Sequence, residues 1–325
     1  HFCLNISSTL IPVDSMVLDA LAWQHHSIGS GAANGTVQLS VGEVSSSASG
    51  PTALISAGIH GDEGPWGAWA IRHLLSTTAL DELQGTLRVV PAANPLAMEA
   101  DARNAPLDTL DLNRSFPGDA QGSHTERLAA TLVAHALPAA GVVIDLHGGG
   151  SWCVNSFVFE MPGAEALAQA FGAPFIAKAP DRTVTLTGYA RSQGAIGVGV
   201  EMGGRSADEE TWARRIADGL RRALQIAGVL RGEPDQPPAQ SIPVGSTRVL
   251  RPSSGGVFIP RLRQEAVGTI VPQGTVLGEL IHPATLQVIE TFTAPYPQTA
   301  LMLLRPMIAR IEGGAMTYVV AEPQL

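Results

Sequence analysis

The segment TALISAGIHGDEGPWGAWAIRHLL, residues 52–75, predicts the fold of the chain around it. It opens with an apolar run of the length of a buried strand, and residues 64–75 repeat apolar side chains with the period of an amphipathic helix. The junction between strand and helix holds His60, Gly61, Asp62 and Glu63. Polar side chains at the end of a buried strand cost free energy unless a partner satisfies them, so this junction is the first candidate functional site.

Apolar runs of strand length alternate with helical patterns over most of the chain. The predicted strands cover residues 35–44, 52–58, 86–94, 141–149, 156–162, 174–180 and 196–204. The predicted helices cover residues 64–80, 123–137, 163–171 and 208–230. Ser123 and Glu126 have the spacing of a capping box at the start of the second helix. The alternation predicts an α/β fold with a mainly parallel or mixed sheet and helices on both faces.

A polar, proline-rich stretch at about residues 231–245 ends the last predicted helix and is the predicted linker between two domains. The first domain covers residues 1–235. The second covers residues 245–325, where short β runs separated by glycine turns predict a small all-β domain, a barrel or a sandwich. Its hairpins are similar to those of biotinyl and lipoyl carriers. No lysine follows Lys178, however, so we expect no cofactor-carrying lysine there.

Composition narrows the class of partner. The formal net charge is −9 and the 20 cationic side chains form no run, so we expect no nucleic-acid partner. No apolar stretch reaches the roughly 18 residues of a membrane span, and residues 1–20 show no basic and apolar signal pattern, so neither a membrane span nor a signal sequence is expected. Cys3 and Cys153 are too few for a disulfide framework, which favours a reducing, cytoplasmic location. A small-molecule partner is expected, and association into a homo-oligomer stays open.

His147 ends the predicted strand at residues 141–149, as His60 and Glu63 follow the strand at residues 52–58. Two histidines and a glutamate are a known ligand set of catalytic zinc, which leaves one coordination position for water. The alternative is that each histidine is an ordinary hydrogen-bonded residue at a strand end. Further polar groups in glycine-rich turns favour the metal site, because such loops often carry function.

Four motifs together resemble the succinylglutamate desuccinylase/aspartoacylase family, which has a zinc-carboxypeptidase-like fold. The motifs are GIHGDE at residues 58–63, DLNRSFPGD at 111–119, DLHGGG at 145–150 and GVEMGG at 199–204. The resemblance covers most of residues 50–205, and the glycine-rich β domain is also similar to that of bacterial members. It makes the first domain the expected zinc-dependent catalytic domain.

The resemblance implies that His60, Glu63 and His147 bind one Zn2+ per chain and that Glu201 is the general base. The sequence around Glu201 is compatible with this role. Glu201 stands in an apolar strand, where burial raises the pKa of a carboxyl group toward the range that general bases use. The alternative is a strand-end glutamate that pairs with an arginine.

The resemblance also implies roles for four residues around the metal. Arg103 would polarise the scissile carbonyl, and Asn113 and Arg114 would line the substrate site. Arg191, ten residues before Glu201, is the expected ligand of a substrate carboxylate. The alternative for Arg103 is a cation on a surface loop.

The sequence also suggests structural roles for Asp145 and Asp111. Asp145 stands two residues before His147 and therefore on the same face of its strand. There it either accepts a hydrogen bond from a metal-binding imidazole or caps a neighbouring turn. Asp111 is expected to orient Arg114 or its loop.

The sequence therefore predicts a zinc-dependent hydrolase that removes an acyl group from an N-acylated amino acid or a similar small amide. The resemblance includes substrates like N-acetylaspartate, N-succinylglutamate and N-acetyl-diaminobutyrate. One alternative is a carboxypeptidase-type peptidase of the same fold. The other is a catalytically silent small-molecule binding protein on the same scaffold. The family's aspartoacylase branch uses a tyrosine of the C-terminal domain, where only Tyr296 and Tyr318 are available, and no motif matches either.

Overall fold

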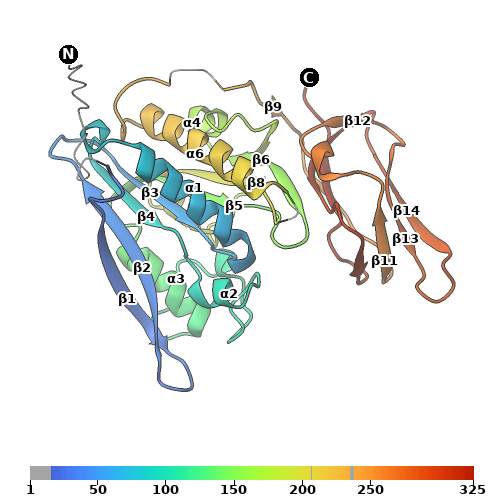
Figure 1. The fold of residues 1–325 in the computed structure, drawn as a ribbon, viewed down its shortest axis with the longest axis horizontal. Coiled ribbons are helices and arrows are strands. Elements are labelled where there is room, and N and C mark those ends of the chain that lie inside the picture. The colour runs from blue at the N-terminus through green and yellow to red at the C-terminus, as the bar shows by residue number, and fades with distance from the viewer. Residues whose placement is uncertain (1–15, 206, 235–237) are drawn as a thin grey trace, which may run out of the picture.

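The computed structural model describes residues 16–205, 207–234 and 238–325. Figure 1 shows a larger α/β body and, beside it, a smaller body of strands coloured orange to red. Within the described residues, a 13-stranded mixed sheet starts in the larger body and continues into the smaller one, where a second sheet of four antiparallel strands also lies. The predicted α/β fold class with additional C-terminal β structure is confirmed.

The centre of the large sheet is parallel, with the strand order β4, β3, β5, β8. These strands span Thr86–Val90, Thr52–Ala57, Ala140–His147 and Ile196–Gly203. All residues of β3 after Thr52 are buried, which explains its continuous apolar run. Because the four strands are parallel, their carboxyl ends lie at one edge of the sheet, where α/β proteins place their ligands.

Antiparallel strands flank this centre and make the sheet mixed. On one side, β2 pairs with β4 and β1 pairs with β2, and on the other side β6 pairs with β8. The strand β7 pairs in parallel with β6 and with β9. These strands span Ala22–Ser30 (β1), Thr36–Ser45 (β2), Val154–Glu160 (β6), Phe175–Lys178 (β7) and Ile242–Pro243 (β9).

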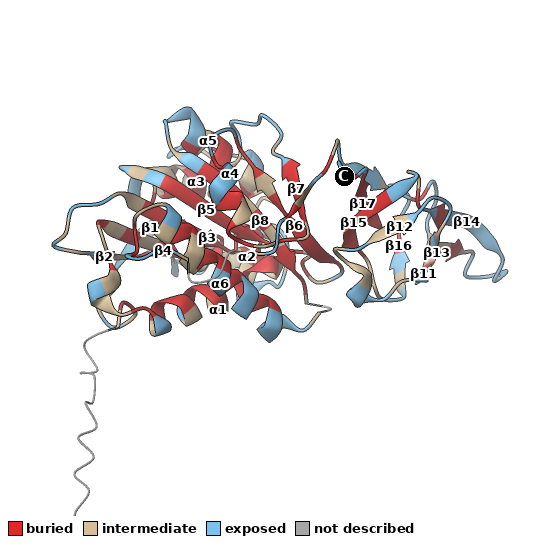
Figure 2. Ribbon diagram, turned by 90° about the horizontal axis from the view of Figure 1, so that it is seen from above, coloured by how far each residue is buried: buried red, intermediate tan, exposed pale blue. Residues whose placement is uncertain are grey.

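Helices cover both faces of the sheet, as Figure 2 shows. One face carries α1 (Gly64–Thr77), α4 (Glu165–Gln169) and α6 (Glu209–Ile226). The other carries α3 (His124–His135) and α5 (Leu186–Ser192), and α2 (Pro95–Glu99) lies against the turn that follows β3. The capping box predicted at Ser123 and Glu126 is confirmed. None of the helices in the described ranges is long and apolar enough to cross a lipid bilayer.

The C-terminal strands divide between the two sheets. The separate sheet has the order β14, β13, β11, β16, while β15 pairs with β6 and so joins β17, β10 and β12 to the large sheet. The separate strands span Gly256–Pro260 (β11), Val276–Ile281 (β13), Val288–Thr293 (β14) and Ala309–Ile311 (β16). The joined strands span Arg248–Leu250 (β10), Ile270–Pro272 (β12), Gln298–Leu304 (β15) and Tyr318–Ala321 (β17).

An aromatic cluster packs the two C-terminal sheets together. The ring of Tyr318 on β17 lies 5.8 Å from that of Phe258 on β11, and Phe258 lies 5.9 Å from Phe292 on β14, measured between ring centroids. The Tyr318 hydroxyl donates a hydrogen bond to the carbonyl oxygen of Leu277 at 2.6 Å. Tyr318 is completely buried, so it serves the core of this part of the molecule.

Candidate active site and metal centre

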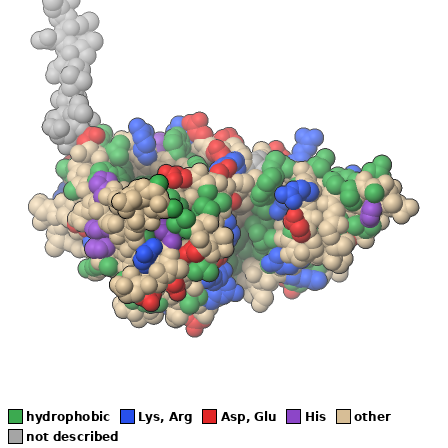
Figure 3. All heavy atoms as spheres, turned by 90° about the horizontal axis from the view of Figure 1, so that it is seen from below, with side chains coloured by type: hydrophobic (Ala, Val, Ile, Leu, Met, Phe, Trp, Pro, Cys, Tyr) green, Lys and Arg blue, Asp and Glu red, His purple; other side chains and the backbone are tan. Residues whose placement is uncertain are grey.

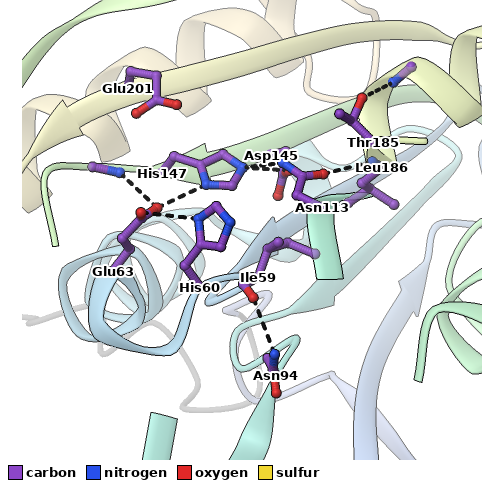
Figure 4. A network of polar contacts seen from close by, with 12 residues as sticks. Ile59, His60, Glu63, Asn94, Asn113, Asp145, His147, Thr185, Leu186 and Glu201 are labelled. Carbon is purple, nitrogen blue, oxygen red and sulfur yellow. Dashed lines mark hydrogen bonds and ion pairs between the residues drawn. The ribbon is translucent and has the colours of Figure 1, made fainter. Parts of the chain in front are cut away.

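The polar residues that follow β3 lie beside the end of β5. β3 ends at Ala57, and a 3-10 turn at Gly61–Glu63 leads directly into α1. His147 is the last residue of β5, which is the parallel neighbour of β3. Figure 4 shows His60, Glu63 and His147 grouped at this edge of the sheet. The sheet topology thus brings together residues that are far apart in the sequence.

His60, Glu63 and His147 fit a metal ion. They are all buried, and one potential ligand atom of each lies within 4.8 Å of the others. Nδ1 of His60 is 3.0 Å from Glu63 Oε1, and Nδ1 of His147 is 2.9 Å from Glu63 Oε2. In the described part of the chain, Nδ1 of His60 makes no hydrogen bond although it is buried. A divalent cation between the imidazoles and the carboxylate would satisfy that nitrogen.

The other ring nitrogen of each histidine faces an aspartate. Nε2 of His60 lies 3.1 Å from Asp111 Oδ1, and Nε2 of His147 lies 2.8 Å from Asp145 Oδ2. Histidines that bind metals usually donate their second N–H to such an oxygen, which fixes the ring and its tautomer. The structure therefore favours the imidazole-holding reading of Asp145, and it gives Asp111 a partner that the sequence did not suggest.

The charges of this group are strongly coupled. Burial alone would raise the pKa of Glu63, but His60 and His147 outweigh it and hold the pKa well below its usual range. Burial alone would lower the pKa of His147, but Asp145 and Glu63 outweigh it and hold the pKa well above its usual range. Protonated imidazoles thus balance the carboxylates when no cation does. A metal ion must displace these protons, because only neutral imidazole binds it.

Arg103 lies at the edge of the metal group. Its Nη1 is 3.3 Å from Glu63 Oε1, and its Nη2 is 3.1 Å from Asp111 Oδ2. Burial alone would lower the pKa of Arg103, but these two carboxylates raise it, so the guanidinium keeps its charge. Arg103 is about half exposed, with 49% of its side chain accessible, so it can also face a ligand in the cavity.

Asn113 and Arg114 belong to a short 3-10 turn, Leu112–Arg114. Asn113 Oδ1 accepts a hydrogen bond from the backbone N–H of Leu186 at 2.9 Å, which orients the amide. Its Nδ2 consequently points toward His147, 3.2 Å from Nε2. Arg114 donates to the carbonyl oxygen of Asn113 and also lines the cavity.

Glu201 stands beside His147 on the neighbouring strand, since the two residues are register partners in β8 and β5. Its carboxylate points toward the metal group in Figure 4. Glu201 Oε2 accepts a hydrogen bond from Asn155 Nδ2 at 2.6 Å. Burial raises the pKa of Glu201 to about 7. The ion pairs of the described residues include none between Glu201 and an arginine.

A cavity of about 640 Å3 contains these groups. All of the site residues predicted from the sequence line it, except Arg191. Residues of the C-terminal strands also contribute, among them Val249, Leu303 and Val319. In Figure 3, hydrophobic side chains border the hollow between the larger body and the C-terminal body. The volume is in the usual range for sites that hold a small organic ligand.

Some arginines that line the cavity were predicted from the motifs and others were not. Arg191, on α5, lies 3.2 Å from Asp181 and is not among the described residues that line the cavity. Arg182 and Arg305 do line it, as does Asn155. No motif points to these three, because single arginines and asparagines in strands and loops are common and only the folded chain shows which of them reach the cavity.

The comparisons with known proteins agree with this geometry. The model of the succinylglutamate desuccinylase/aspartoacylase catalytic domain matches residues 49–227, more than half of the 325 residues. The chain belongs to this family. The resemblance of the four motifs is thereby confirmed. The family consists of deacylases, and this member has a buried His60, Glu63 and His147 group that could hold a metal ion.

Three relatives illustrate the similarity. An N-alpha-acetyl-L-2,4-diaminobutyric acid deacetylase of Halomonas elongata is 34% identical to this chain over 58% of the chain's residues. The match spans 59% of the length of that relative. The structure of a succinylglutamate desuccinylase/aspartoacylase from Rhodobacter sphaeroides matches with a TM-score of 0.79 and 27% identity, over 93% of this chain and 96% of that one. An aspartoacylase family protein of Mesorhizobium loti matches with a TM-score of 0.76 and 26% identity, over 94% and 96%.

Proposed function

We propose that the protein is a zinc-dependent hydrolase that cleaves the amide bond of a small N-acylated amino acid. The observation that carries the proposal is a buried His60, Glu63 and His147 group that shares one cavity with Glu201. Relatives named as a deacetylase and as desuccinylase/aspartoacylase proteins support amide cleavage. The cavity's size and its arginines suit a small substrate with a carboxylate.

In this proposal His60, Glu63 and His147 hold one zinc ion per chain, which supplies Lewis-acid activation of a water molecule and of the amide carbonyl. Asp111 and Asp145 accept the Nε2–H of the two imidazoles. The Nδ1 lone pairs of both imidazoles would then be available to bind the ion together with the Glu63 carboxylate.

Glu201 is the proposed proton carrier. Asn155 holds Oε2, which leaves Oε1 to take a proton from water as the water oxygen bonds to the carbonyl carbon. Glu201 then gives this proton to the amide nitrogen as the carbon–nitrogen bond breaks, so that a carboxylic acid and a free amine result. In the metal-free site burial raises the pKa of Glu201 to about 7, so this carboxyl already holds a proton more readily than an exposed glutamate does.

Arg103, Asn113 and Arg114 are the proposed polar contacts of the substrate. Arg103 stabilises the negative charge that develops on the carbonyl oxygen, a contribution commonly worth about 3 to 4 kcal/mol. Asn113 offers an amide whose orientation is fixed, and Arg114 offers a planar fork to a carboxylate. The substrate is thus proposed to be gripped at its carbonyl and at its carboxylate.

We also propose a division into a catalytic domain, residues 1–235, and a C-terminal domain, residues 245–325, joined by a linker at about residues 231–245. Thr247, Val249 and Arg305 belong to the second part and line the cavity. The C-terminal domain is therefore proposed to narrow the mouth of the active site.

The test is an assay of the zinc-loaded protein with N-acetyl and N-succinyl amino acids beside dipeptides of the same residues. We expect faster cleavage of the acylated amino acids. Glu201→Gln should keep its zinc and lose about 10²- to 10⁴-fold in kcat, because glutamine cannot accept the proton. Glu165→Gln, at an exposed glutamate of α4, is the matched control and should act like wild type.

Two results would contradict the proposal. Faster cleavage of dipeptides than of acylated amino acids would favour the carboxypeptidase alternative. Turnover by Glu201→Gln within about threefold of wild type, which is below the usual contribution of a general base, would mean that another group carries the proton.

A further inference from the structure

The floor of the cavity beside Glu201 is apolar. β6 and β8 form it, with Phe157 opposite Glu201 and Phe159 opposite Gly199 in the antiparallel register. Directly opposite residues have their side chains on the same face of a sheet, as do residues two apart. Phe157 and Phe159 therefore share the face of Glu201, with their rings edge to face and 5.0 Å between centroids. We call the part of the cavity lined by Phe157, Phe159, Met161 and Gly199 the apolar groove.

Gly199 keeps the apolar groove open. Its φ is not positive, so its backbone does not require glycine. A Cβ added there would meet only Phe159, at 3.6 and 3.9 Å, which are ordinary contact distances. At Gly197, two residues earlier, an added Cβ would lie 3.1 Å from Met161 and 3.2 Å from Thr187. Packing therefore explains the glycine at 197, whereas position 199 leaves space for a ligand.

Two arginines line the same cavity as the apolar groove. Arg114 and Arg182 line the cavity, and neither lies within ion-pair distance of a carboxylate in the described ranges. Both are tied to the start of α5, because Asn113 accepts a hydrogen bond from Leu186 and the carbonyl oxygen of Arg182 accepts one from Thr185. Guanidinium groups without a carboxylate partner, directed at a cavity, suit a ligand that brings its own carboxylate.

The arginines and the apolar groove together indicate which half of the substrate lies in the groove. In an N-acylated amino acid, the free carboxylate and the side chain belong to the same half of the molecule. A carboxylate bound by Arg114 and Arg182 would then place the amino-acid side chain, and not the acyl group, over Gly199 and against the phenylalanines. The ring faces of Phe157 and Phe159 offer this side chain apolar contact but no hydrogen-bond partner.

We propose that the preferred substrate is the N-acyl derivative of an amino acid with an apolar side chain of the size of leucine or phenylalanine. This inference rests on the proposed function, since it names the substrate class of that site. A charged side chain would lose its hydration in the apolar groove without gaining a partner there, which disfavours aspartate, glutamate and diaminobutyrate in this position.

The first test compares substrates on the zinc-loaded wild-type protein. The kcat/KM values of N-acetyl-L-leucine and N-acetyl-L-phenylalanine should exceed those of N-acetyl-L-aspartate, N-acetyl-L-glutamate and N-alpha-acetyl-L-2,4-diaminobutyrate by at least about tenfold. Equal or higher values for any charged substrate would overturn the inference and leave the proposed function intact.

Binding separates the two proposals. Calorimetric titration of zinc-loaded Glu201→Gln with the same compounds should show the same order of affinities without turnover. If the wild type hydrolyses none of them while the apolar ones still bind more tightly, the proposed function falls and the inference on the groove holds. If the charged ones bind as tightly as the apolar ones, the inference falls.

Variants locate the selectivity. Gly199→Leu fills the apolar groove, so the ratio of kcat/KM for N-acetyl-L-phenylalanine to that for N-acetylglycine should fall at least about tenfold. The matched control is Gly141→Leu on β5, where an added Cβ meets only the carbonyl oxygen of Thr52, at 3.9 Å, and the ratio should stay at its wild-type value.

A second variant, Phe159→Ala, tests the inference independently in case Gly199→Leu does not fold. Phe159→Ala removes one wall of the apolar groove, so the ratio of kcat/KM for N-acetyl-L-leucine to that for N-acetylglycine should fall at least about threefold through lost apolar contact. An unchanged ratio in a folded Phe159→Ala protein would overturn the inference whatever Gly199→Leu does.

Discussion

At the scale of single residues, His60 and His147 are used in the same way. Each turns Nδ1 to Glu63 and Nε2 to an aspartate, and the two rings lie 5.0 Å apart between centroids. Two imidazoles oriented alike around one carboxylate form a preorganised donor set, which binds a cation without first paying to order its side chains.

The first prediction concerns the metal. Purified protein incubated with zinc and then desalted should hold about one equivalent, and His60→Ala should hold close to none, because two ligands do not retain zinc through desalting. His73→Ala is the matched control, since His73 lies on α1 and stacks on Trp69, outside the cavity. Elemental analysis makes the measurement. Full metal content in His60→Ala would remove His60 from the ligand set.

A second prediction follows from the partly buried carboxyl of Glu201, whose pKa is raised from 4.5 to about 7. The folded state holds this proton more tightly than the unfolded chain does, so between these values the free energy of unfolding of the metal-free protein falls as the pH rises. Above about pH 7 the full cost is present, on the order of 1 to 3 kcal/mol.

Glutamine carries no such cost. In the presence of a chelator, the free energy of unfolding of Glu201→Gln should therefore exceed that of the wild type at about pH 8. The difference between the two should shrink toward about pH 5. Urea denaturation at the two pH values measures it. A difference that grew on acidification would have the wrong sign and would show that burial does not raise this pKa.

The sequence predicted the site residues that belong to motifs, but not those that reach the cavity only through the fold of the chain. His60, Glu63 and His147 were predictable because two strands of a parallel sheet end beside each other. Arg182 and Arg305 were not, because their positions depend on a loop and on the pairing of β15 with β6. The contact of Asp111 with His60 spans 51 positions and has no local signal.

At the scale of elements, the strongly buried strands and the long amphipathic helices were predictable, and two other classes were missed. β1 was not predicted because it is an edge strand with mostly exposed side chains, so its sequence shows little apolar alternation. α5 (LTGYARS) was missed because its short sequence holds a glycine and polar residues and shows no clear apolar repeat. It matters nonetheless, since its first residue orients Asn113.

The prediction at this scale concerns the start of α3. Ser123 Oγ accepts from the N–H of Glu126, and Glu126 Oε2 accepts from the N–H of Ser123 at 2.8 Å. Ser123→Ala removes the first of these bonds and should lower the free energy of unfolding by about 1 kcal/mol. Ser47→Ala, at an exposed serine, is the control. Urea denaturation would refute the role of the cap if both variants matched the wild type.

At the scale of the whole molecule, the large sheet does not stop at the predicted domain boundary. β15 pairs with β6 through Leu303 and Leu304, and Met302 and Val319 share a buried cluster with Phe157. The C-terminal part thus shares both hydrogen bonds and core with the larger body. Such sharing favours unfolding as one cooperative unit.

This coupling can be measured because all five tryptophans lie at or before position 212. Tryptophan fluorescence therefore reports mainly the larger body, with Trp152 also lying against Arg305 of the C-terminal part. Far-ultraviolet circular dichroism reports both parts. The two signals should give the same midpoint in urea. Two separated transitions would mean that the C-terminal part unfolds independently.

Lys178 is the single side-chain amine of the chain that can be modified chemically. It is the only lysine of the chain, 76% of its side chain is exposed, and its neighbours Ala179 and Pro180 line the cavity. Reagents that acylate side-chain amines have a single target here, so a dye or a resin coupled through lysine would be attached in one orientation. That orientation would turn the cavity toward the support, which makes coupling through this lysine a poor way to immobilise the protein in working form.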